Sequence, residues 1–165
     1  SIPFPTNGAF DYLENMVDSD GLLPNDRTHV FKLSGFWRPD FGLTVGTFFV
    51  LASGTPLNVF EASSVGSPFV NFAQPRGTAG RTPTTWDLNF RFTYDLGKAL
   101  AKSWKARLIV DVFHVGNPRE PVVYDQVTYF NQDAEGNQIN PNPTYGMATR
   151  YQPPMALRMG LEFLF

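Results

Sequence analysis

The 165-residue sequence contains no cysteine, which excludes disulfide bonds, thiolate metal ligands and a cysteine nucleophile. Charge is also scarce, because Asp, Glu, Lys and Arg make up only 17% of the chain and the net charge is −2. Nothing in this balance favours nucleic acid as a partner. No apolar run approaches the roughly 20 residues of a membrane-spanning helix, whereas about 9–11 alternating residues are enough for a strand of a membrane barrel.

Aromatic residues and turn formers are abundant. Aromatics make up 15% of the chain, with 16 Phe, and there are 14 Gly and 14 Pro. Aromatic enrichment beside a shortage of charge is typical of a β-rich protein with more than one apolar surface, and the Gly and Pro predict many turns or long loops. The sequence begins at Ser1 with neither Met nor a signal peptide, which indicates a processed or cut chain.

The last eleven residues, MALRMGLEFLF, alternate with a period of two. Every odd position from Met155 to Phe165 is apolar, and the even positions are small, charged or mixed. This period places the two sets on opposite faces of a strand. Taken alone, the pattern is better explained by the last strand of a soluble sandwich, but here the chain ends on an aromatic residue of the apolar face.

Four further segments have strand character. They are residues 28–38, 43–53, 85–96 and 104–115, and the phase of the second is the least clear. The segments between them alternate in length: 39–42 and 97–103 are short, whereas 1–27, 54–84 and 117–154 are long. We therefore expect an all-β, antiparallel fold, with a short strand-like piece at 122–129 inside the last long loop and one or two helical turns within 9–17.

The charged residues of four strands keep to one parity within each strand. They are Lys32 and Arg38, then Asp87, Arg91 and Asp95, then Lys105, Arg107 and Asp111, and finally Arg158 and Glu162. With a free phase for each strand, chance gives this about once in 64. Lipid would enforce such an exclusion, because a charge on the lipid face near the midplane costs roughly 2–4 kcal/mol. A sandwich core would enforce it too.

Tryptophan positions and loop lengths favour lipid over a sandwich. Trp37, Trp86 and Trp104 lie on the apolar parity at strand ends, where membrane barrels place interfacial aromatics. Long extracellular loops and short periplasmic turns also fit the alternation, with the C-terminus periplasmic and Ser1 on the extracellular side. Five strands cannot close a barrel alone, because unpaired edges cannot face hydrocarbon. We expect the chain to be the end of a larger barrel.

These residues resemble a known family, the C-terminal barrel portion of TonB-dependent outer-membrane receptors, especially its Oar-like branch. The similar stretches are residues 23–35 (LPNDRTHVFKLSG), 53–56 (SGTP), 108–117 (LIVDVFHVGN), Tyr145-Gly146 and 153–165. Within the last, Arg158, Gly160, Phe163 and Phe165 are similar to the signal that the barrel assembly machinery recognises. The resemblance implies a bacterial outer-membrane barrel of about 22 strands around a plug, importing a substrate with energy relayed by TonB through an N-terminal part that is absent here.

By this resemblance, polar strand residues face the barrel lumen and bond to the plug or to one another. The candidates are Lys32, Asp87, Asn89, Arg91, Asp95, Arg107, Asp111, Arg158 and Glu162. Ion pairing along the wall explains any one of them more simply than substrate contact. Ligand selection falls to the long loops, whose aromatics either stack on a substrate or pack the loops: Phe60, Phe69, Phe72, Tyr124, Tyr129 and Phe130.

The sequence is also compatible with functions other than transport. The rival to transport is a receptor-like barrel that serves as a structural or secretion subunit of a larger envelope complex. An enzyme is not expected, although Asp87, Asp95, Asp111 and Glu162 include possible carboxylate acid–base pairs of the glycosidase type. Residues 18–21 faintly resemble a calcium loop, and residues 133–137 carry cation-type ligands, but solvated turns explain both. No cofactor is expected.

Overall fold

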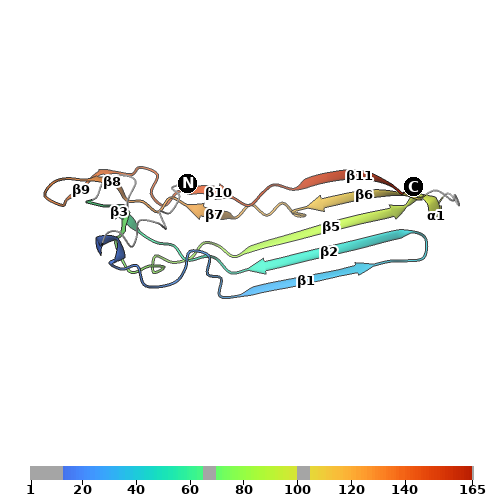
Figure 1. The fold of residues 1–165 in the computed structure, drawn as a ribbon, viewed down its shortest axis with the longest axis horizontal. Helices are drawn as coiled ribbons and strands as arrows, with labels where there is room; N and C mark the ends of the chain where they lie inside the picture. The colour runs from blue at the N-terminus through green and yellow to red at the C-terminus, as the bar shows by residue number, and fades with distance from the viewer. Residues whose placement is uncertain (1–12, 65–69, 100–104, 165) are drawn as a thin grey trace. The chain divides into compact units, whose positions relative to one another are not determined.

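The structure is a computed structural model that describes residues 13–64, 70–99 and 105–164 (Figure 1). The described residues form two compact units, one from the described parts of 1–28, 54–83 and 121–151 and one from the described parts of 29–53, 84–120 and 152–165. We call these the loop unit and the sheet unit. Strands are the main regular elements of the described residues, which confirms the all-β prediction. The described residues contain no helix that is both long and apolar enough to cross a membrane.

The sheet unit is one antiparallel sheet of five strands. They are β1 (Val30–Trp37), β2 (Leu43–Ala52), β5 (Thr85–Asp95), β6 (Lys105–Phe113) and β11 (Ala156–Leu164), in the order β1-β2-β5-β6-β11. Each observed strand is within two residues of its predicted bounds. One helical turn, α1 (Leu96–Ala99), follows β5 where the sequence predicted only a connection. Within the described residues the sheet is open, with β1 and β11 as its edges.

The register of the sheet aligns the two sequence parities across all five strands. For example, Trp37 pairs with Val45, which pairs with Phe92 on the next strand. Phe92 in turn pairs with Val110, which pairs with Met159. Because directly paired residues of antiparallel strands share a face, the apolar parity forms one face and the charged parity the other. The register also resolves the phase of the second strand, because it places Leu43, Val45, Phe49 and Leu51 on the apolar face.

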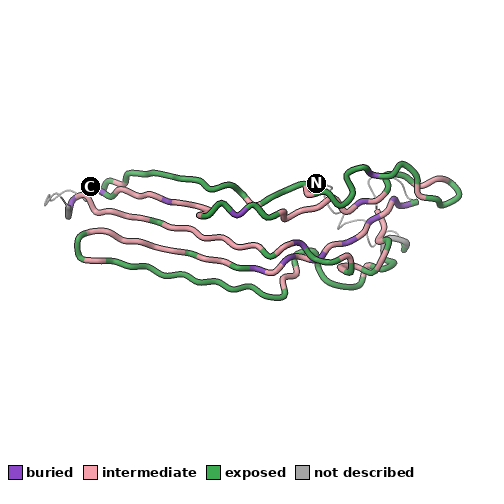
Figure 2. Tube along the Cα trace, turned by 180° about the vertical axis from the view of Figure 1, so that it is seen from behind, coloured by how far each residue is buried: buried purple, intermediate pink, exposed green. Residues whose placement is uncertain are grey.

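The apolar face of this sheet is exposed. Figure 2 shows both edge strands in the exposed colour, and on β11 the side chains of Leu157, Met159 and Leu161 are 63%, 65% and 61% exposed. The large buried hydrophobics of the described residues, Phe60 and Val127, both lie in the loop unit. The five strands thus do not form the dry layer between two sheets that a soluble sandwich requires.

The long loops, which belong to the loop unit, contain short ladders that the sequence did not predict. It contains the turn η1 (Leu13–Met16), inside the segment expected to form helical turns, and three two-stranded ladders. These are β3 (Phe60–Ala62) with β4 (Val70–Phe72), β7 (Pro121–Tyr124) with β10 (Ala148–Tyr151), and β8 (Tyr129–Gln132) with β9 (Gln138–Pro141). The strand-like piece predicted at 122–129 is in fact the end of β7 and the start of β8.

Hydrogen bonds between distant segments hold the loop unit together. The backbone N–H of Phe60 donates to the carbonyl of Gln126 (2.8 Å), and Thr128 donates its own N–H back to the Phe60 carbonyl (2.8 Å). The Gln138 side chain both accepts from and donates to the backbone of Ala62 (3.1 and 3.0 Å). Since these bonds satisfy buried backbone groups, they fix β3 against β8 and the segment before it.

The two segments considered as cation loops are turns in the structure. Asp133 closes the β8–β9 turn by accepting hydrogen bonds from the N–H groups of Glu135 and Asn137 and from the Asn137 side chain. Ser19 donates to the carbonyl of Met16 at the end of η1. Among the described residues no three acidic or histidine side chains gather closely enough to hold a metal ion.

Asp125 is the hydrogen-bonding centre of the segment that joins β7 to β8. One carboxylate oxygen accepts from the side chains of Asn142 (2.9 Å) and Thr144 (2.7 Å), and the other accepts from the N–H of Val127 (3.2 Å). Partial burial raises the pKa of Asp125, but these hydrogen bonds to the charged form outweigh burial and hold its pKa below the usual value.

We expect the contribution of Asp125 to stability to depend on pH. Because the pKa of Asp125 is lower in the folded state than in the unfolded state, its ionised carboxylate stabilises the fold. This contribution is complete above the unfolded pKa of about 3.9 and is lost as pH falls through the folded pKa. Hydrogen exchange at pH 7 should show that Asp125→Asn lowers the free energy of opening of residues 121–151 by about 1 kcal/mol relative to the wild type. The difference should shrink below about pH 4. Glu135→Gln, at an exposed carboxylate of the same unit, is the matched control for the loss of one carboxylate.

Candidate functional site: the charged face of the sheet

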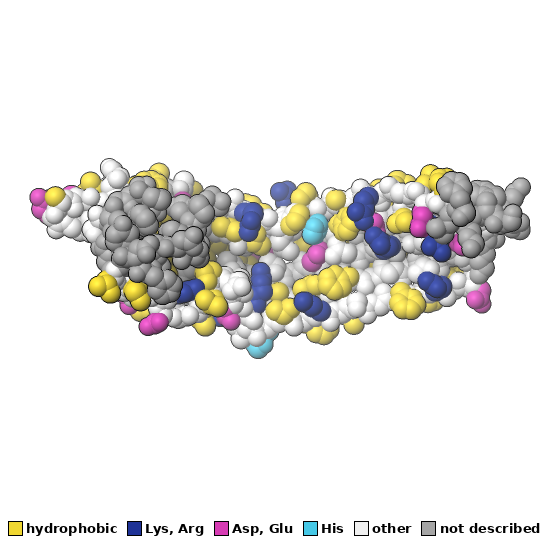
Figure 3. All heavy atoms as spheres, viewed as in Figure 1, with side chains coloured by type: hydrophobic (Ala, Val, Ile, Leu, Met, Phe, Trp, Pro, Cys, Tyr) yellow, Lys and Arg dark blue, Asp and Glu magenta, His cyan; other side chains and the backbone are white. Residues whose placement is uncertain are grey.

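All nine predicted lumen-facing residues lie on one face of the sheet, which we call the charged face. Lys32 pairs with Val50, and Val50 pairs with Asp87, so these residues form one row across the sheet. The rows further along contain the other seven, namely Asn89, Arg91, Asp95, Arg107, Asp111, Arg158 and Glu162. Figure 3 shows basic and acidic side chains gathered over this sheet.

Asp111 is the centre of the charged face. Arg91 on β5 donates from Nε to Oδ1 of Asp111 (2.6 Å), and Arg158 on β11 donates from Nη2 and Nε to Oδ2 (2.7 and 2.9 Å). The Asp111 side chain is 5% exposed, whereas the two arginines are 58% and 63% exposed. The Arg158 guanidinium also lies over the Phe113 ring, 5.4 Å from its centroid. One carboxylate thus links three neighbouring strands, and the three charges together leave a surplus of +1.

A second cluster lies near the end of β6 and was missed from the sequence. His114 places Nδ1 2.7 Å from Oδ1 of Asp87, and Asn89 donates to the other oxygen of Asp87 (2.9 Å). The His114 N–H donates to the side-chain oxygen of Asn89 (3.1 Å). His114 adopts a positive φ of 54°. The sequence signal for this turn was the run His114 to Asn117, in which Gly116 and Asn117 favour positive φ.

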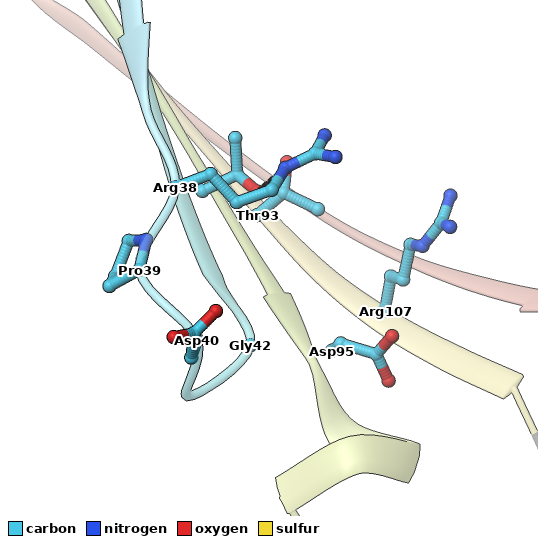
Figure 4. A pocket seen from close by; sticks show the side chains of 8 residues that line it. Arg38, Pro39, Asp40, Gly42, Thr93, Asp95 and Arg107 are labelled. Carbon is cyan, nitrogen blue, oxygen red and sulfur yellow. Dashed lines mark hydrogen bonds between the residues drawn. The ribbon is translucent and has the colours of Figure 1, made fainter.

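A polar recess of about 430 Å³ lies on the sheet unit between the β1–β2 turn and the ends of β5 and β6. In Figure 4 the side chains of Arg38 and Arg107 extend to the same side of the ribbon, with Asp95 near the base of Arg107. Arg38 donates to the Thr44 hydroxyl (3.2 Å), and Arg107 lies 3.6 Å from Glu162. Because opposite charges alternate here, the recess suits polar groups rather than a bare anion.

Two of the three predicted interfacial tryptophans lie on the apolar face. Trp37 is the last residue of β1, is 60% exposed and contacts the Phe41 ring edge-on at 6.4 Å. Trp86 lies at the start of β5 against Gly116, where an added Cβ would lie 2.7 Å from the ring. Trp104 lies outside the described residues, and so does Phe165, whereas Gly160 and Phe163 of the predicted assembly signal lie on β11.

The chain that forms this two-faced sheet is similar in sequence to a known protein. The chain is 33% identical to a segment of a TonB-dependent transporter. That protein is the TonB-dependent transporter Oar of Myxococcus xanthus, and the alignment extends over 132 residues and 75% of this chain. The likeness supports the resemblance inferred from the motifs. It is a likeness to part of a transporter, because the chain spans only 12% of the length of that relative.

Two further comparisons found nothing. No family model matches the chain, and no solved structure matches it.

Proposed function

We propose that the chain is part of the wall of an outer-membrane β-barrel of the TonB-dependent transporter family and that its charged face lines the lumen. The observation that carries the proposal is the register, which puts every charged residue of the five sheet strands on one face and leaves an exposed apolar face opposite. In water such an apolar surface would drive association. Against acyl chains it is the stable arrangement, because lipid replaces water on that face.

The open edges support a larger barrel. β1 and β11 each have one neighbouring strand within the described residues. The N–H and C=O groups on the outer edge of each strand would cost several kcal/mol apiece if they stayed unpaired in hydrocarbon. Strands elsewhere in the same protein would pair with these edges and complete a barrel of about 22 strands around a plug. The long connections would then be extracellular and the short turns periplasmic, as would the C-terminus. Import of a substrate with energy from TonB is the function of such a barrel.

Spin labels on neighbouring positions of β11 test the proposal. Leu161 lies on the apolar face and Glu162 on the charged face, and the chain has no cysteine of its own. In the full-length protein reconstituted in lipid, a label at Leu161→Cys should collide preferentially with oxygen dissolved in lipid. A label at Glu162→Cys should collide with a water-soluble nickel complex instead, because it faces the lumen.

Two results would decide against the proposal. Equal contact of both labels with water would show that the apolar face does not meet lipid. The two labels could instead behave as predicted while the lumen holds another polypeptide in place of a plug. That result would favour a structural or secretion subunit over a transporter.

A further inference from the structure

A recess of about 300 Å³ in the loop unit has the build of a small-molecule site. It is lined by Phe60, Val123, Tyr124, Asp125, Gln126, Val127, Phe130 and Thr149. Phe60 and Val127 are about 5% and 6% exposed and form its buried part, whereas Phe130 is 50% exposed and belongs to its rim. The volume is at the lower end of the range for ligand pockets, which suits a compound of one or two rings.

The walls of the recess are fixed before any ligand arrives. The Phe60 ring packs against the Phe72 ring with 5.0 Å between centroids. Gln126 accepts the N–H of Asn58 on its side-chain oxygen (2.5 Å) and the N–H of Phe60 on its backbone carbonyl (2.8 Å). A pocket held in this way loses little entropy when it binds, so its contacts translate more fully into affinity.

The lining selects the chemical class of the ligand. Its rings come from three separate elements, Phe60 on β3, Tyr124 on β7 and Phe130 on β8, and aromatic walls favour another aromatic ring. Asp125 is the charged residue of the lining, and the described lining residues include no Lys, Arg or His. An anionic ligand would be repelled, whereas a cation would be attracted both by the carboxylate and by the ring faces.

We propose that this recess binds a small aromatic compound that carries an amino group. The inference goes beyond the proposed function and rests on the loop unit alone. It would stand even if the sheet did not line a membrane barrel, because all of the lining residues belong to the loop unit.

Tryptamine and indole-3-acetate form a matched pair of probes, because they share a ring system and differ in the sign of their charge. Isothermal titration of the purified full-length protein should show saturable tryptamine binding. Indole-3-acetate should bind at least about 5-fold more weakly at low salt. Asp125→Asn should bring the two affinities to within about 2-fold of each other, because it removes the charge that separates them.

Neighbouring residues of β8 provide the control for the aromatic wall. Phe130 lines the recess, whereas Tyr129 beside it does not. Phe130→Ala should weaken tryptamine binding about 5-fold, and Tyr129→Ala by less than about 2-fold. Thr149→Trp, at an exposed rim position, should block binding by filling the recess, which provides a second test if Phe130→Ala does not fold.

Each opposite outcome would overturn the proposal. Absence of saturable tryptamine binding, preference for indole-3-acetate, or unchanged affinity in both Phe130→Ala and Thr149→Trp would show that the recess is not such a site. None of these results would affect the spin-label test of the sheet, so the two proposals fail separately.

Discussion

Val110→Arg should remove most of the assembled full-length protein from the outer membrane, whereas Ile109→Arg should leave most of it in place. Val110 lies on the apolar face, in register with Phe92 and Met159. An arginine on a lipid-facing position near the midplane costs roughly 2–4 kcal/mol. The fraction of protein that keeps its folded mobility on an unheated SDS gel should therefore fall at least about tenfold.

Ile109 is the matched control for this prediction. It is also an aliphatic residue of β6, one position away, but it shares its row with Thr93 and Gly160 on the charged face. On the proposed function, an arginine there would point into the lumen, where water and neighbouring carboxylates would solvate it. Equal loss of both variants, or greater loss of Ile109→Arg, would contradict the assignment of the faces. The spin-label experiment then separates lipid from a protein core as the apolar surroundings.

Asp111→Ala should cause the second-largest loss of stability, about 1–3 kcal/mol. Removing this carboxylate leaves Arg91 and Arg158 close together without the acceptor that they share. Breaking a fully buried pair costs about 3–5 kcal/mol, and the lower value expected here follows from the exposure of the two arginines. The free energy of unfolding of the full-length protein in lipid, measured by denaturant titration, checks this value.

Glu162→Ala provides the comparison for Asp111→Ala. Glu162 pairs with Arg107 at 3.6 Å, and both side chains are nearly half exposed. Such a pair contributes about 0–1 kcal/mol, because water screens it. If Glu162→Ala were as costly as Asp111→Ala, the sharing of one carboxylate by three strands would not be the stabilising feature. A double-mutant cycle of Asp111→Ala and Arg158→Ala would isolate their coupling.

The sequence predicted the five strands of the sheet and the side that each residue faces. Parity is a local property, so residues such as Arg91 and Asp111 could be assigned to a face from their own strands alone. Their pairing could not be predicted in this way, because register depends on which rows of neighbouring strands meet. The meeting of Arg91, Asp111 and Arg158 in one row emerges from the structure alone.

The ladders of the loop unit were not predictable for a different reason. β7 and β9 contain Pro121 and Pro141 and have only four residues each, so neither shows an alternating period long enough to recognise. β7 pairs with β10 across more than twenty residues of intervening chain. The sequence did not reveal these ladders because hydrogen bonds to distant partners, rather than local pattern, define their strands.

The discontinuity of the loop unit has a consequence for the order of events during folding. Its contacts join stretches far apart in sequence, as between Asp26 and Arg81, Phe60 and Gln126, or Ala62 and Gln138. Closing such long separations is entropically slow, and the intervening chain contains strands of the sheet. We therefore expect the three stretches to acquire their mutual contacts late, after β2, β5 and β6 have paired and brought their ends together.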